Sequence, residues 1–165
     1  METATSTREG RQVAHRPPAS VLALALLLLL LVVGALQGGL AMVTNPIDPL
    51  GMSLDFLSDA PVDDYFWPGM FLLGIAAASA VTMVGLVFPW RWAWARGIEG
   101  AIGYRWPWIG AMATGVVLLG FEVLELFMVP FHPLMHPLLI GGSVAIVALA
   151  STTSARRHLL ADDDD

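Results

Sequence analysis

Four long apolar blocks separated by polar connections dominate the chain. They lie at about residues 21–43, 66–88, 106–129 and 134–152. Each is close to the roughly 20 residues that a helix needs to cross the hydrocarbon core of a bilayer. Apolar residues fall in continuous runs, without the one-sided spacing of a helix on a soluble core. The pattern therefore predicts an all-α integral membrane four-helix bundle built from four transmembrane helices.

The connections divide the chain into one membrane domain and two tails. We expect a cytoplasmic N-terminal tail at residues 1–19, the four-helix domain at 20–153 and a cytoplasmic acidic C-terminal tail at 154–165. A secretory signal is the alternative for the first apolar block, with cleavage near Gly39 and Ala41. A signal peptide has an apolar region of only about 7–15 residues, however, and this block is longer.

The basic residues indicate how the chain is oriented. All 8 are arginines. They precede the first apolar block, separate the second from the third, and follow the fourth. The other two connections contain none, so the positive-inside rule predicts that both termini are cytoplasmic. Because lysine is absent while Ala, Gly and Val are abundant, the composition indicates a high-GC bacterial genome and hence a plasma (inner) membrane. The arginines are Arg8, Arg11, Arg16, Arg91, Arg96, Arg105, Arg156 and Arg157.

Tryptophan placement predicts the same orientation. Trp67 falls at the expected outer interface, and the other five fall near the inner one. Indole rings favour the headgroup level of a bilayer, which makes these residues membrane anchors. Their interleaving with arginine is also seen in nucleic-acid-binding segments, but membrane spans on both sides argue against nucleic acid as a partner. The inner set is Trp90, Trp92, Trp94, Trp106 and Trp108.

The outer connection, residues 44–65, combines turn sequences with acidic residues. The sequence Asp48-Pro49 followed by Gly51 is typical of a turn, and Ser53 is placed to cap a short helical turn. Its five aspartates have no basic residue near them. They form either a surface that attracts cations or simply the turns and caps of a loop that excludes arginine. They are Asp48, Asp55, Asp59, Asp63 and Asp64.

Small residues predict how the spans pack. Gly34 and Gly38 form a G-x-x-x-G pattern in the first block, and glycines recur in the other three. Such residues allow close helix approach in lipid. Short connections favour antiparallel pairing of the second block with the third and of the third with the fourth.

A polar cluster beneath the outer surface is the candidate functional site. Glu122 and Glu125 are the acidic residues within the spans, and their i, i+3 spacing places them on one helix face. His132 lies in the following turn, and His136 begins the fourth block. Antiparallel pairing would bring Glu125 and His136 to similar depth. Charged groups inside a bilayer usually face a bundle interior, a cavity or a partner.

Three interpretations of this cluster are open. In the first, Glu122 is a structural, protonated or hydrogen-bonded group, and the histidines cap the turn. In the second, the two glutamates and the two histidines are possible ligands of a divalent ion, with Glu125, His132 and His136 as the named candidates, although Pro133 and Pro137 disturb the regular spacing of the histidines. In the third, Glu122, Glu125 and His136 relay protons. No motif for a nucleotide or another cofactor occurs, so no cofactor is predicted. The lack of cysteine excludes thiolate chemistry.

Several further motifs give a resemblance over the span region. Gly38-Gly39, Asp48-Pro49 with Gly51, Asp64-Tyr65 and Pro68-Gly69 carry it through the first half of the chain. Gly120 with Glu122-Val123, and Pro137 with Gly141, extend it. The chain resembles small four-span membrane proteins of high-GC actinobacteria, a family of unknown function. The resemblance implies an acidic residue at position 122 and an apolar residue where Glu125 stands.

Two functional hypotheses follow. The first is a multi-pass membrane protein that serves as a structural or accessory subunit, because the bundle is too small to enclose a wide aqueous path. The alternative is a membrane-embedded enzyme or proton-coupled carrier that uses Glu122, Glu125 and His136 near the outer face. The expected partners are the lipid bilayer and either a second copy of the chain or a larger membrane complex.

Overall fold

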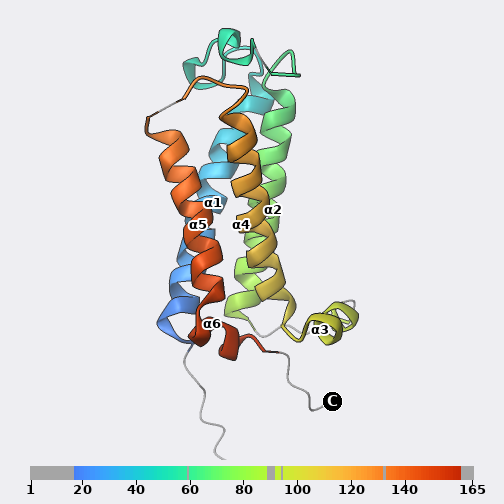
Figure 1. Ribbon diagram of the computed structural model, residues 1–165. Helices are drawn as coiled ribbons and strands as arrows, with labels where there is room; N and C mark the ends of the chain where they lie inside the picture. Colours follow the sequence, from blue (N-terminus) through green and yellow to red (C-terminus); the bar gives the residue numbers. More distant parts are fainter. Residues whose placement is uncertain (1–16, 59, 89–91, 94, 132, 161–165) are drawn as a thin grey trace, which may run out of the picture.

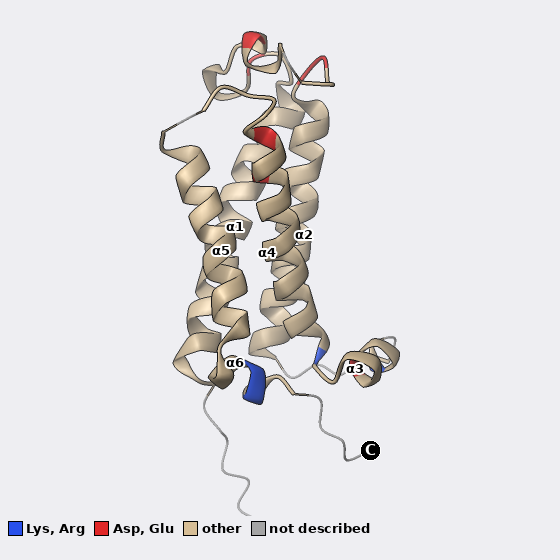
Figure 2. Ribbon diagram, in the orientation of Figure 1, with Lys and Arg blue, Asp and Glu red and all other residues tan. Residues whose placement is uncertain are grey.

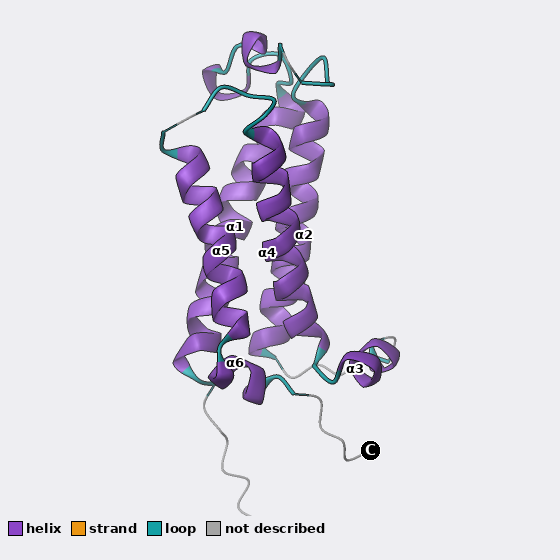
Figure 3. Ribbon diagram, in the orientation of Figure 1, coloured by secondary structure: helices purple, strands orange, loops and turns teal. Residues whose placement is uncertain are grey.

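The computed structural model describes residues 17–58, 60–88, 92–93, 95–131 and 133–160. Regular structure in these segments is helical, as Figure 3 shows, apart from one isolated bridge between Tyr104 and Leu160. The all-α prediction is therefore confirmed for this part of the chain. Predicted features outside the described residues are the N-terminal arginines Arg8, Arg11 and Arg16, then Asp59, Trp90, Arg91, Trp94, His132 and the aspartates after Ala161.

Long helices from four parts of the sequence lie side by side (Figure 1). Helix α1 packs along α2, α2 along α4, α4 along α5, and α5 along α1. Within the described segments, three helices, α1, α2 and α4, are long and apolar enough to cross a membrane, and α5 is a shorter apolar helix. Their bounds are α1 (Ala19–Thr44), α2 (Phe66–Val87), α4 (Trp106–Glu125) and α5 (Met135–Ser151).

The third apolar block forms a shorter helix than expected. We expected it to continue to Val129, but α4 ends at Glu125. Residues 126–129 continue as turns, in which the Met128 and Val129 amides both donate to the Glu125 carbonyl. Pro130 explains the change, because proline disfavours helical backbone at the residue before it and cannot donate to the preceding turn.

Two short helices lie at the end of the molecule opposite these turns. They are α3 (Arg96–Ile102) and α6 (Thr153–His158), and the sequence had suggested only a connection and a tail there. Gly103 ends α3 in a left-handed conformation, with φ of 76°. The hydroxyl of Thr152 caps α6 by accepting a hydrogen bond from the Ala155 amide at 3.3 Å. Leu159 is buried, so the packed region extends beyond the expected boundary at residue 153.

Contacts between α6 and the segment before α4 close this end, which we call the arginine end because Arg96, Arg105, Arg156 and Arg157 lie there (Figure 2). The Arg156 Nε donates to the Tyr104 hydroxyl at 2.8 Å, and the Tyr104 ring stacks on Trp108. The Arg105 amide donates to the Leu159 carbonyl at 2.9 Å. The hydroxyls of Ser20 and Ser154 are 2.8 Å apart, which ties α6 to the beginning of α1.

Close approach of α1 and α2 depends on one pair of glycines. A Cβ on Gly69 would lie 2.7 Å from the Met42 Cβ and 3.0 Å from the Gly39 carbonyl oxygen. The predicted Gly34–Gly38 pattern marks this contact only in part. A Cβ on Gly34 would meet nothing within 4 Å, and one on Gly38 would make an ordinary contact with Leu72 Cδ1 at 3.5 Å. Among these α1 glycines, the closest approach is at Gly39, where a Cβ would lie 2.9 Å from the Gly69 carbonyl oxygen.

The tryptophans divide between surface and interior. Trp67 is 68% exposed, as expected for an interfacial anchor. Trp106 is buried instead, and its ring lies so close to α2 that a Cβ on Gly85 would collide with it. The Trp108 indole N–H donates to the Ala150 carbonyl at 2.9 Å. These two rings therefore also join helices, a packing role that we had not predicted for them.

We predict that Gly69→Ala lowers the free energy of unfolding by about 1–3 kcal/mol, because the added methyl group overpacks the α1–α2 contact. Gly74→Ala on the same helix is the matched control, since its Cβ would meet nothing within 4 Å. That variant should be neutral or up to about 1 kcal/mol more stable. Thermal unfolding in detergent measures both changes, and equal effects would contradict the packing argument.

Candidate functional site

The end of the molecule opposite the arginine end carries the connection between α1 and α2, and we call it the loop end. Two short 3-10 turns, η1 (Pro49–Gly51) and η2 (Leu54–Leu57), shape it. The Ser53 hydroxyl accepts from the Asp55 amide at 3.1 Å. The predicted turn at Asp48-Pro49 and the predicted cap at Ser53 are both confirmed.

Tyr65 holds this connection against the helix ends. Its side chain is buried, its amide donates to the Pro46 carbonyl at 2.9 Å, and its hydroxyl donates to the Ser53 carbonyl at 2.9 Å. Burial raises the pKa of the Tyr65 hydroxyl, and the negative charge of Glu125 raises it further. Sequence reasoning gave Tyr65 no role, although it lies within the Asp64-Tyr65 motif of the resemblance.

Three predicted site residues converge at the loop end. Glu122, Glu125 and His136 each offer one possible ligand atom, and these atoms all lie within 4.8 Å of one another. The glutamates share a face of the last turns of α4, and His136 comes from the first turn of α5. Antiparallel packing of α4 and α5 therefore brings Glu125 and His136 together, as the sequence suggested. We call these three residues the polar cluster.

The members of the polar cluster differ in burial. Glu122 is only 1% exposed and His136 4%, whereas Glu125 is half-buried. The Glu122 Oε2 is buried and has no hydrogen-bond partner among the described residues. The Phe131 ring stacks on the His136 imidazole, with ring centroids 5.4 Å apart, and so restricts its orientation.

The aspartates of the α1–α2 connection lie at the same end of the molecule as the polar cluster, and the described arginines lie at the other end. Figure 2 shows acidic residues in the α1–α2 connection and near the end of α4, while the described arginines lie at the arginine end. The negative charge of the loop end favours the approach of cations and disfavours anions. The acidic residues described in the connection are Asp48, Asp55, Asp63 and Asp64.

His132, which sequence reasoning included among possible metal ligands, lies outside the described residues. The structure therefore brings together two of the three predicted metal ligands, Glu125 and His136. Glu122, the other carboxylate of the cluster and also a candidate for proton transfer, lies beside them.

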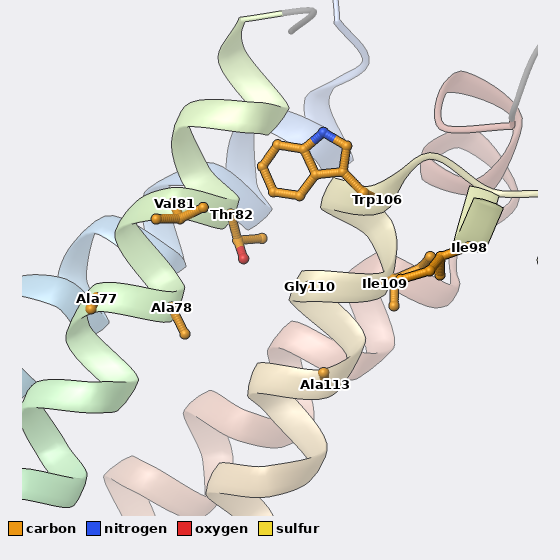
Figure 4. Close-up of a pocket in the computed structure, with 9 residues that line it drawn as sticks. All are labelled: Ala77, Ala78, Val81, Thr82, Ile98, Trp106, Ile109, Gly110 and Ala113. Atoms are coloured by element: carbon orange, nitrogen blue, oxygen red, sulfur yellow. The ribbon is translucent and has the colours of Figure 1, made fainter. Parts of the chain in front are cut away.

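A separate apolar groove of about 410 Å³ lies between α2 and α4, toward the arginine end (Figure 4). Val81, Thr82 and Trp106 contribute to its wall, and Gly110 lies where a Cβ would collide with Thr82. Ala113, at its far side, precedes Glu122 by nine residues, or roughly 13 Å along the helix. The groove offers almost no polar surface and is separate from the polar cluster.

Two carboxylates and an imidazole at this spacing suit two kinds of chemistry. They can exchange a proton among themselves, since both residue types accept and release protons in membrane proteins. They can also coordinate a cation, because carboxylate oxygen and imidazole nitrogen are common metal ligands. Binding of anions is disfavoured by the charge of the two glutamates and their surroundings.

No protein-family model matches the chain, and no match was found among curated proteins or solved structures. The polar cluster must therefore be interpreted from its own geometry.

We predict that Glu122→Met raises the free energy of unfolding by about 1–3 kcal/mol in metal-free buffer. Methionine has a similar length, and it removes a buried oxygen that has no partner. The measurement is thermal unfolding of the purified protein in detergent. A marked loss of stability would show that Glu122 is a structural, hydrogen-bonded group.

The same substitution at Glu99 should change the free energy of unfolding in the opposite direction. The Glu99 Oε1 accepts a hydrogen bond from the Trp106 amide at 2.8 Å and so caps the beginning of α4. Glu99→Met should therefore cost about 0.5–2 kcal/mol, the usual effect of losing a cap.

Proposed function

We propose that the protein crosses a bacterial plasma membrane four times, through α1, α2, α4 and α5, with both termini in the cytoplasm. Helix α5 has 17 residues, which span about 26 Å and lie at the lower limit for crossing a bilayer. The separation of arginines from the aspartates of the loop end supports this orientation. The loop end then faces outward, and the polar cluster lies just beneath the outer surface.

Within this topology, we propose that the protein is an accessory subunit of a larger membrane complex and that the polar cluster is its working centre, which takes up a cation from the outer side. The burial of Glu122, with one oxygen lacking a partner, carries this proposal. An uncompensated polar group at this position costs stability. Groups of this kind persist where function requires them.

An outward-facing polar residue supports the role of subunit. Gln37 lies about two turns before the end of the hydrophobic helix α1 and is exposed. Gly34, one turn earlier, is also exposed, and a Cβ there would meet nothing within 4 Å. Small residues and amide side chains on the outer face of a membrane helix favour contact with another helix. This face suits a partner subunit or a second copy of the chain.

A membrane-embedded enzyme or proton-coupled carrier is the second candidate. It is favoured by the half-buried position of Glu125, between the buried Glu122 and the outer connection. Such an arrangement suits stepwise proton movement between two carboxyl groups. In this case the chain would act without a partner, alone or as a homo-oligomer.

We also propose that the chain belongs with the small four-span proteins of high-GC actinobacteria that its motifs resemble. Glu122, the acidic position of that resemblance, is the most buried member of the polar cluster. Tyr65 and Gly69, which belong to its other motifs, make close contacts at the same end of the molecule.

Labelling of single cysteines tests the topology, because the chain has no cysteine of its own. Ser58→Cys in the α1–α2 connection should react with a membrane-impermeant maleimide in cells with an intact plasma membrane. Gly100→Cys in α3 is the matched site at the arginine end, where a Cβ would meet nothing within 4 Å. It should react only after permeabilisation. The reverse pattern would contradict the proposed orientation.

Copurification from native membranes in mild detergent tests the subunit role. We expect wild-type protein to retain a partner chain, and Gln37→Leu to lose it while remaining folded. Leu26→Met, a conservative change at an exposed position of the same helix, should leave the complex intact. Isolation of the wild type as a single chain in several mild detergents would contradict this role and favour the second candidate.

Replacement of Glu122 by Gln tests the working centre in cells. We expect a growth or transport defect with normal protein level and normal copurification, because the amide keeps the shape but loses the charge and the exchangeable acid proton. Glu99→Gln is the control, since it preserves an acceptor oxygen at the cap of α4. An unchanged phenotype for Glu122→Gln would refute the role of the polar cluster.

A further inference from the structure

We propose that the polar cluster is a binding site for one divalent transition-metal ion of the zinc class. This inference rests on the proposed function and names the cation that the working centre takes up. Glu122 and Glu125 supply one oxygen each, and His136 supplies a ring nitrogen.

The distances allow a single ion to contact all three residues after a small adjustment. Their possible ligand atoms lie within 4.8 Å of one another. Donor atoms on one tetrahedral zinc ion are roughly 3.5 Å apart, given bonds of about 2.0–2.2 Å. A separation at the upper limit must therefore shorten by roughly 1 Å when the ion binds. Side-chain rotation is sufficient for a change of this size.

The charges favour a divalent ion. Two ionised carboxylates and a neutral imidazole carry a charge of −2, so a divalent ion makes the complete site neutral. Neutrality matters here because Glu122 and His136 are buried, and uncompensated charge in such surroundings is costly. A monovalent ion would leave one negative charge in the interior.

The donor types favour a transition metal over magnesium or calcium. Both of those ions prefer oxygen ligands, and magnesium in addition retains several waters. Imidazole nitrogen instead suits zinc, iron, copper and nickel. The lack of cysteine removes the thiolates that favour copper(I). Three protein ligands also leave a fourth position open, as in zinc sites that bind water or a substrate.

The unpaired oxygen of Glu122 is the independent observation that points to a ligand. The Glu122 side chain is 99% buried in the polar cluster, since only 1% of it is exposed, and its Oε2 lacks a hydrogen-bond partner among the described residues. A buried carboxylate oxygen without a partner is strongly disfavoured. A bound cation would supply the missing interaction.

The surroundings favour entry from the loop end. The aspartates of the α1–α2 connection raise the local concentration of cations, and the described arginines lie at the other end. The stacking of Phe131 on His136 restricts the imidazole ring before an ion arrives. Such orientation of a ligand by its neighbours increases metal affinity.

Metal titration of the purified full-length protein tests the proposal. The protein is prepared in detergent without a histidine tag and dialysed against chelator. Zinc chloride, manganese chloride and magnesium chloride are then added separately, and bound metal is measured by equilibrium dialysis with elemental analysis. We expect one zinc ion per chain and a higher thermal midpoint with zinc. Magnesium at the same concentration should produce neither effect.

Matched variants assign the binding to the polar cluster. Glu122→Gln and His136→Ala should each weaken zinc binding at least about 100-fold, since even loss of a residue that only orients a ligand costs 10–100-fold. Glu99→Gln and His158→Ala, at the arginine end, are the controls and should bind zinc as the wild type does. Glu125→Gln provides a further ligand variant should either of the first two fail to fold. X-ray absorption of the zinc complex should show one imidazole and oxygen ligands.

Three results would overturn the metal site: no stoichiometric zinc, equal binding of magnesium, or unchanged zinc binding in folded ligand variants. A cellular defect of Glu122→Gln together with any of these results would leave the proposed working centre standing, with the proton as its cation. Zinc binding by the wild type without any cellular defect of Glu122→Gln would instead support the metal site and refute the proposed function.

Discussion

The cost of placing charge in an apolar medium governs the arrangement of this protein. Where its helices are surrounded by apolar side chains, ionised groups are excluded to the two ends, and the described arginines and aspartates accordingly occupy opposite ones. Several polar side chains within the helices turn inward, as do Ser79, Thr114 and Ser143, whereas Gln37 of α1 faces outward. The Glu122 side chain also faces the interior, but its burial is costly because one of its carboxylate oxygens has no hydrogen-bond partner among the described residues. The Ser79 hydroxyl also lacks a partner among the described residues, but a carboxylate costs more to bury than a hydroxyl does.

Much of the helical arrangement could be predicted because apolar block length and proline positions are strong local signals. The boundaries of α2 agree with expectation within one residue. Helices α3 and α6 could not be predicted, since each is short and depends on distant partners. Leu159, for example, is buried only because α6 folds back toward Arg105. The packing role of individual glycines could not be predicted either, because the rotation of a helix decides how closely each residue approaches its neighbour. A Cβ on Gly38 would make an ordinary contact at 3.5 Å, whereas one on Gly39 would lie only 2.9 Å from the Gly69 carbonyl oxygen.

The polar cluster, too, could be predicted from the sequence only in part. The i, i+3 spacing of the glutamates and the short turn between α4 and α5 sufficed to predict that Glu125 and His136 lie near each other. The difference in burial between Glu122 and Glu125 depends on the rotation of α4 relative to its neighbours, which no local pattern specifies. Tyr65 was missed for a related reason, since its role depends on a hydrogen bond to Ser53, twelve residues earlier. Residues that act through tertiary contacts leave little trace in composition or spacing.

The contact between Ser20 and Ser154 has a consequence for how the molecule is made. These residues are 134 positions apart and join the beginning of α1 to α6. During synthesis, α1 and α2 can pair early, but the ring of helices can close only when α5 packs against α1, and the Ser20–Ser154 contact can form only after α6 has followed. The side of α1 that later meets α5 therefore lacks this partner until α5 has been synthesised. Maturation of the polar cluster, which needs both α4 and α5, is thus a late event in biogenesis.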